Sequence, residues 1–108
     1  MAPFFSRDIR AVISRVEEQI SSVENEIVVL RDEQYHRENC LDELLSQPNS
    51  EERIALILQQ NDITINQIIT MQGNIAQMRR RTNELAHLLN VADVREKHQR
   101  LLFGSFLV

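Results

Sequence analysis

Three histidines and one cysteine, His36, His87, His98 and Cys40, are the residues best suited to metal binding or nucleophilic chemistry. A single cysteine cannot form an internal disulfide or a cysteine-rich zinc site. The three histidines have no metal-ligand spacing with one another or with Cys40. We therefore expect the three histidines to lie on the surface. The sequence predicts no catalytic, cofactor-binding or metal-binding residues, and it is not typical of an enzyme.

Arg79, Arg80 and Arg81 form the only run of like charge in the chain. Such a run can bind phosphate groups or anionic lipids, as in an adaptor associated with nucleic acid or with a membrane surface. Two observations weigh against that role. The whole chain has a net charge of −4, and three consecutive residues of a helix point in different directions. We favour pairing with acidic side chains of a neighbouring helix, such as Glu17.

The elements that must position these residues follow from length and composition. The chain has 108 residues, of which 43% are hydrophobic, with only 2 Gly and 2 Pro. So few glycines cannot supply the turns of a sandwich, a barrel or a phosphate-binding loop. The hydrophobic share is too high for a disordered chain, and no apolar run approaches the ~20 residues of a transmembrane helix. Once these classes are excluded, the composition predicts one small domain of long helices.

Residues 46–50, with the sequence SQPNS, give the one strong turn signal. The residue before a proline disfavours helical geometry, so a first helix should end near Ser46. Asn49 is a good N-cap for a second helix, with Glu52 three residues later as its capping-box partner. The sequence therefore predicts helices at about residues 6–46 and 50–92, with Ser6 as the N-cap of the first and a turn at residues 47–49.

Seam residues recur at alternating spacings of three and four in both predicted helices, which is typical of helices that supercoil against a partner. The first stripe comprises Ile9, Ile13, Val16, Ile20, Val23, Ile27, Leu30, Gln34, Arg37, Leu41 and Leu44. The second comprises Ile54, Ile57, Asn61, Thr64, Ile68, Met71, Ile75, Met78, Thr82, Leu85, Leu89 and Ala92. Folding at the turn pairs residues whose numbers sum to 98. The predicted fold is all-α, a long antiparallel two-helix hairpin (a coiled coil) over residues 6–93.

Polar residues interrupt both stripes at matching levels. The pairing places Arg37 opposite Asn61 and Gln34 opposite Thr64. Polar coiled-coil positions of this kind can fix the register of two helices, with Glu33 or Glu38 as the partner of Arg37. The alternative, to which we give equal weight, is that the helices splay near the turn and these layers are wet.

Apolar residues outside the stripes indicate a further protein surface. A two-helix hairpin buries one narrow stripe on each helix, whereas a wide apolar face is typical of a larger bundle. The residues predicted to contact a partner along the shaft are Val28, Val29, Leu58, Ile65 and Ile69.

The ends of the chain carry most of its aromatic residues. Residues 1–5 form a predicted apolar arm, and residues 94–108 a basic and apolar docking segment that is a short helix or a tail. We expect a bend near residues 90–93, because the apolar residues beyond it follow a different face. The segment would dock on its own hairpin, on a partner or on a membrane. Its predicted partner-binding residues, with those of the arm, are Phe4, Phe5, Leu101, Leu102, Phe103, Phe106 and Leu107.

Together these features predict a non-enzymatic structural or adaptor subunit without a cofactor. It would be a homo-oligomer or part of a hetero-oligomeric helical complex, assembled through coiled-coil faces and the apolar C-terminal segment. One alternative is a secreted or filament-forming hairpin whose apolar C-terminus drives polymerisation. The other is the peripheral membrane- or nucleic-acid-associated adaptor that uses Arg79 to Arg81. A single cysteine mildly favours a reducing, intracellular compartment.

Overall fold

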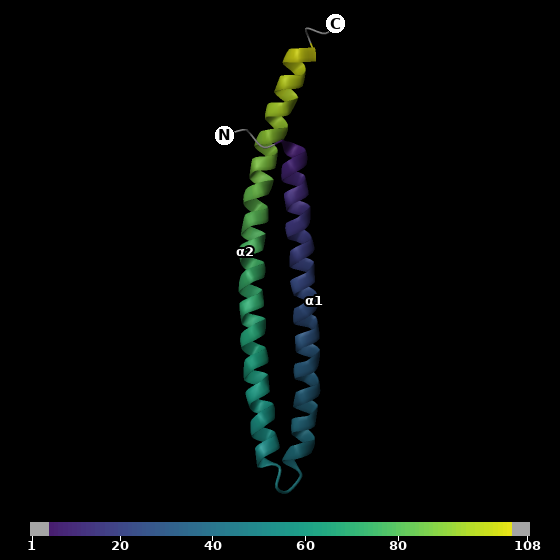
Figure 1. Cartoon of the computed structure of the whole chain (residues 1–108), viewed down its shortest axis with the longest axis vertical. Coiled ribbons are helices and arrows are strands. Elements are labelled where there is room, and N and C mark those ends of the chain that lie inside the picture. Colours follow the sequence, from purple (N-terminus) through teal and green to yellow (C-terminus); the bar gives the residue numbers. More distant parts are fainter. Residues whose placement is uncertain (1–4, 105–108) are drawn as a thin grey trace. The chain divides into compact units, whose positions relative to one another are not determined.

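The computed structural model describes residues 5–104, except for the side chains of residues 103 and 104. It contains two helices, α1 (Ser6–Leu45) and α2 (Glu51–Gly104), and no strand among the residues it describes. The chain divides into two compact units. The turn unit is Ser21–Ala76, and the terminal unit comprises residues 5–20 and 77–104 within the described range. The predicted all-α helical hairpin is confirmed at this level (Figure 1).

In the turn unit, α1 and α2 run antiparallel around the predicted seam. Ile27, Ile68 and Ile75 are buried, and so are the polar residues Asn61 and Thr64. The other predicted seam residues of this unit are half-buried, and their neighbours outside the stripes are exposed, the turn residue Ser50 apart. Burial therefore follows the seven-residue repeat because each helix turns one stripe toward the other.

The terminal unit pairs the beginning of α1 with the later part of α2. Ile9, Val16, Ile20 and Ala92 are buried in its seam, and the remaining seam residues are half-buried. Ala92 is only 2% exposed. Its burial fits the predicted pairing of residues whose numbers sum to 98, which places Ala92 opposite Ser6.

The connection between the helices comprises residues 46–50, one residue more at each end than the predicted turn. The backbone N–H of Ile54 donates to the carbonyl of Ser50 at 2.9 Å, so Ser50 is the N-cap of α2. The prediction that Asn49 is the N-cap is therefore wrong. Asn49 instead has φ of 58°, a left-handed conformation that asparagine tolerates better than most residues. The hydroxyl oxygen of Ser50 lies 2.7 Å from the carbonyl oxygen of Leu44 and 2.9 Å from that of Gln47. Its one proton is shared between these two acceptors, which ties α2 to the end of α1.

The start of α1 also differs by one residue. The carbonyl of Phe5 accepts the N–H of Ile9 at 3.1 Å, so Phe5 rather than Ser6 occupies the N-cap position. Ser6 is then the first helical residue, and its own N–H has no acceptor within α1.

α2 continues to Gly104, so the predicted end of the second helix at about residue 92 is wrong. The reason lies in the composition of residues 91–104, which contain no proline and no glycine before Gly104. Glu96, Lys97 and Arg100 are good helix formers, and Glu96 precedes Arg100 by four residues, a favourable charge spacing. The later part of α2 extends past the first residue of α1 in the terminal unit (Figure 1).

Candidate functional site

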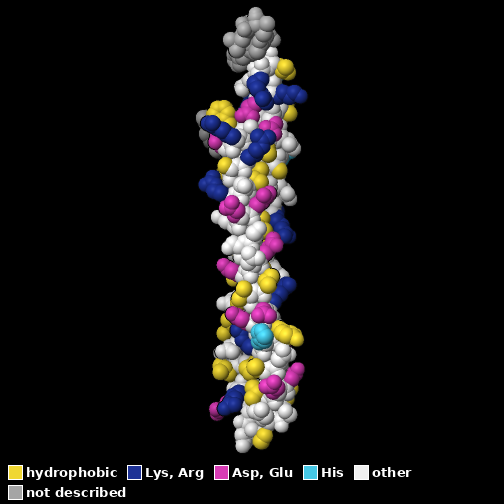
Figure 2. All heavy atoms as spheres, turned by 90° about the vertical axis from the view of Figure 1, so that its right-hand side faces the viewer, with side chains coloured by type: hydrophobic (Ala, Val, Ile, Leu, Met, Phe, Trp, Pro, Cys, Tyr) yellow, Lys and Arg dark blue, Asp and Glu magenta, His cyan; other side chains and the backbone are white. Residues whose placement is uncertain are grey.

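Exposed apolar side chains on both helices of the turn unit form the main candidate surface. All five residues predicted to contact a partner along the shaft are exposed, including Val28 at 65% and Ile69 at 59% of their full area. Seven-residue spacing along α2 places Leu58 and Ile65 on one face. The structure adds four exposed apolar residues that the sequence prediction left out, namely Tyr35, Leu45, Leu56 and Ile63. Hydrophobic side chains are visible among charged ones on the face shown in Figure 2.

A groove of about 440 Å³ lies between the helices of the turn unit. Val29 and Leu30 of α1 and Met71 of α2 give it an apolar lining, and Ser22, Asn25, Glu26 and Gln67 line the remainder. Leu30 and Met71 are half-buried seam residues, so the groove opens the edge of the seam to the surface. It is suited to apolar side chains of another protein because it combines an apolar lining with a polar border.

The predicted polar layers come together inside the turn unit. Nη1 of Arg37 donates to Oγ1 of Thr64 at 2.7 Å, while Nη2 approaches Oε2 of Glu33 at 3.5 Å. Thr64 is only 3% exposed. Arg37 reaches the layer next to the one predicted for it, and Glu33 is the acidic partner that the sequence indicated. Gln34 is half-buried in the same region.

Asn61 is the polar residue of this region whose hydrogen bonding is incomplete. It is buried, and its Oδ1 has no hydrogen-bond partner among the described residues. An unpaired buried carbonyl costs free energy of folding, about 1–3 kcal/mol. The buried Asn61 Oδ1 therefore lowers the stability of the fold, and the role of this layer in register stays a prediction.

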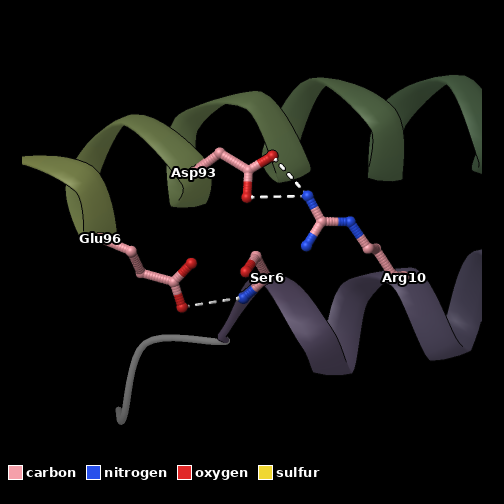
Figure 3. Close-up of polar contacts among 4 residues, drawn as sticks. All are labelled: Ser6, Arg10, Asp93 and Glu96. Carbon is pink, nitrogen blue, oxygen red and sulfur yellow. Dashed lines mark hydrogen bonds and ion pairs between the residues drawn. The ribbon is translucent and has the colours of Figure 1, made fainter.

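Two polar contacts join α1 and α2 in the terminal unit (Figure 3). The backbone N–H of Ser6 donates to Oε1 of Glu96 at 3.2 Å. Nη2 of Arg10 lies 3.1 Å from Oδ1 and 2.9 Å from Oδ2 of Asp93. The Glu96 carboxylate thus accepts the N–H that begins α1, and its charge lies at the positive end of that helix dipole.

The same contact shifts the titration of Glu96. Hydrogen bonds from the side chain and then the backbone of Ser6 lower the pKa of Glu96 below its ordinary value, and Arg95 and Arg100 add to the effect. Partial desolvation opposes this shift. The carboxylate is therefore held in its charged form, which is the form that accepts a hydrogen bond from the helix terminus.

Neither contact was part of the sequence prediction, although a signal for Glu96 was present. The seam positions Leu89 and Ala92 are followed by position 96 when the seven-residue repeat is continued. The predicted repeat ends at Ala92 and therefore includes neither Asp93 nor Glu96.

Apolar residues are also exposed in the terminal unit. Phe5, Leu101 and Leu102, which were predicted to bind a partner, are exposed there. Leu88, Val91 and Val94 are further exposed apolar residues of α2. The predicted contacts at Phe4, Phe106 and Leu107 lie outside the described residues, as does the side chain of Phe103.

The remaining chemically capable residues lie on the surface. His36, His87, His98 and Cys40 are exposed, and so are Arg79, Arg80 and Arg81. Nε2 of His36 is 3.5 Å from Oδ2 of Asp32, one turn earlier in α1. Within the part of the chain that the structure describes, no three His, Cys, Asp or Glu side chains are grouped to hold a metal ion. Neither helix has a segment that is both long and apolar enough to cross a bilayer.

No protein-family model, curated protein or solved structure matches this chain. The candidate surfaces therefore depend on the geometry and burial of the residues themselves.

Proposed function

We propose that the chain is a non-enzymatic structural or adaptor subunit that assembles with itself or with other helical proteins. The observation that carries this proposal is the exposure of apolar side chains on both helices of the turn unit. Full burial of a Val, Leu or Ile side chain is worth about 1.5–3 kcal/mol, so a few half-exposed ones suffice to drive association. A surface of this kind, bordered by polar residues, is typical of protein interaction sites.

The form of assembly that we propose is a helical bundle. The exposed residues Leu58, Ile65 and Ile69 form a second apolar stripe beside the seam of α2. A helix with two adjacent apolar stripes can pack against two neighbours, one on each stripe. The partner helix in α1 covers the seam stripe, and a helix of another chain would cover the second.

Sedimentation velocity over a wide range of protein concentration tests the proposal. We expect the wild-type chain to associate, or to form a stable complex with a copurifying helical protein. Ile69→Lys should weaken that association, because it places a charge in the second stripe. Asn74→Lys is the matched control, since Asn74 is exposed on the same helix outside this stripe. A chain that stays monomeric at high concentration and is recovered without a partner would contradict the proposal.

Exposed leucines near the end of α2 favour a second candidate, a filament-forming hairpin subunit. Leu101 is 65% exposed and Leu102 is 51% exposed. In this version the C-terminal segment of one copy docks on another copy, and the contact repeats to give a filament. Deletion of residues 101–108 should then abolish filaments seen by electron microscopy. Unchanged assembly of the shortened chain would exclude this candidate.

A further inference from the structure

The two units carry charge of opposite sign. The turn unit, Ser21–Ala76, has 10 Asp and Glu against 3 Arg, a net charge of −7. The rest of the chain has 6 Asp and Glu against 9 Arg and Lys, a net charge of +3. All 10 acidic residues of the turn unit are exposed. On the face shown in Figure 2, several basic side chains lie close together near the C-terminal part of α2.

The apolar groove of the turn unit lies within an acidic face. Glu26 lines the groove, and Glu33 follows it after seven residues, with Val29 between them. Residues spaced by three, four and seven lie on one face of a helix. This face of α1 therefore presents an apolar residue between two carboxylates, and Cys40 continues it after another seven residues.

The terminal unit has a face of the complementary kind. Leu88 and Val91 are exposed apolar residues three positions apart on α2. Arg81 precedes Leu88 by seven residues and Arg95 follows it by seven, so both lie on the same face. This face presents Leu88 and Val91 beside the exposed guanidinium group of Arg81. Glu84 lies on the same face, and Arg95 is half-buried at its far end.

We propose that two copies of the chain dock antiparallel, so that the turn unit of each copy packs on the terminal unit of the other. This inference rests on the proposed function and names the partner as a second copy. Leu88 and Val91 of one copy cover the groove at Val29 of the other, with Arg81 beside the acidic face. Two-fold symmetry makes the same contact twice and closes the assembly. A parallel dimer would instead place two turn units of charge −7 together.

Cys40 provides a direct test because it is exposed and is the only cysteine of the chain. A benzophenone-maleimide is attached to Cys40, and the labelled protein is mixed with an excess of the ¹⁵N-labelled Cys40→Ser chain. After irradiation, mass spectrometry of mixed-isotope peptides identifies crosslinks between copies. We expect them in residues 1–20 and 77–108 of the second copy. Crosslinks between copies that fall within residues 21–76 would overturn the antiparallel arrangement.

Charge reversal tests the same contact without a label. Arg81→Glu alone and Glu26→Arg alone should each weaken dimerisation by at least ~10-fold, because like charges then face each other across the interface. Arg81→Glu combined with Glu26→Arg in one chain should restore most of the affinity. The matched controls are Arg80→Glu, on a different face of α2, and Asp42→Arg, outside the Glu26–Glu33 face of α1. A combined variant no tighter than either single variant would overturn the proposal.

The outcomes separate this inference from the proposed function. A dimer whose crosslinks contradict the antiparallel arrangement leaves the proposed function standing. A monomer that is recovered in a stable complex with another helical protein overturns only the dimer. A monomer that is recovered alone overturns both. Dimerisation that weakens as the salt concentration rises supports the antiparallel contact, because exposed charges are screened.

Discussion

The carboxylate of Glu96 accepts the backbone N–H of Ser6 at 3.2 Å, so a side chain near the end of α2 satisfies the first N–H of α1. The contact links positions that are 90 residues apart in sequence. It stabilises the terminal unit in two ways, because it pairs a donor that α1 cannot pair itself and places a negative charge at the helix N-terminus. The nearby Arg10–Asp93 ion pair is exposed, and such pairs contribute only about 0.2–1 kcal/mol.

Glu96→Gln should lower the thermal midpoint of unfolding at neutral pH and have little effect in acid. The pKa of Glu96 is lowered in the folded chain, so the folded state binds this proton less tightly than the unfolded state. The stabilisation is therefore fully present above the unfolded-state pKa and is lost as pH falls through the lowered pKa. Circular dichroism melts of both proteins over a pH series measure the difference. Glu84→Gln, at an exposed glutamate of the same helix, should give a smaller difference than Glu96→Gln at neutral pH.

The paired stripes were the part of the fold that could be predicted from the sequence. Every residue assigned to them is buried or half-buried, because a seven-residue repeat over many turns leaves one consistent way to face a partner helix. Pro48 located the turn for a local reason, since it restricts the residue before it. The hydrogen bond made by Ser50 could not be predicted from the neighbouring sequence. Its hydroxyl bonds the carbonyl of Leu44, a partner that exists only once the chain has folded back.

The candidate site was predictable only in part. Exposure of Val28, Val29 and Ile69 follows from their positions outside the seam, which the sequence gives directly. The groove beside Val29 also depends on the size and direction of the side chains around it, which no spacing pattern specifies. A spacing pattern shows that an apolar side chain is not buried within its own hairpin, but it does not identify the partner that would bury it.

Ser50→Ala should destabilise the chain by about 1–2 kcal/mol. Ser50 is buried, and its hydroxyl shares one proton between the carbonyls of Leu44 and Gln47, so removal of this donor leaves acceptors unpaired. Urea unfolding followed by circular dichroism measures the effect. Ser46→Ala is the control, because that hydroxyl bonds the carbonyl of Glu43 at an exposed position and its loss should cost less than about 0.5 kcal/mol. Equal effects of the two substitutions would argue against a structural role for the buried hydroxyl.

Gly73→Ala should stabilise α2 by about 0.5–1 kcal/mol. Glycine is less favourable than alanine inside a helix by this amount, because it loses more conformational freedom on folding. A Cβ at position 73 would meet nothing within 4 Å, so the methyl group introduces no strain. Thermal unfolding measured under conditions where the chain is monomeric gives the intrinsic effect. A loss of stability under those conditions would contradict the helical geometry at this position.

Asn61→Leu should stabilise the fold and loosen its register. The substitution removes a buried Oδ1 that has no partner among the described residues and adds apolar contact, for an expected gain of about 1–3 kcal/mol. Asn83→Leu, at an exposed position of α2, is the control and should change stability by less than about 0.5 kcal/mol. Urea unfolding gives both values. If Asn61 also selects the register, the amide NMR spectrum of Asn61→Leu will contain more than one set of resonances for the turn unit. A single set of resonances together with increased stability would show that Asn61 destabilises the fold and does not select its register.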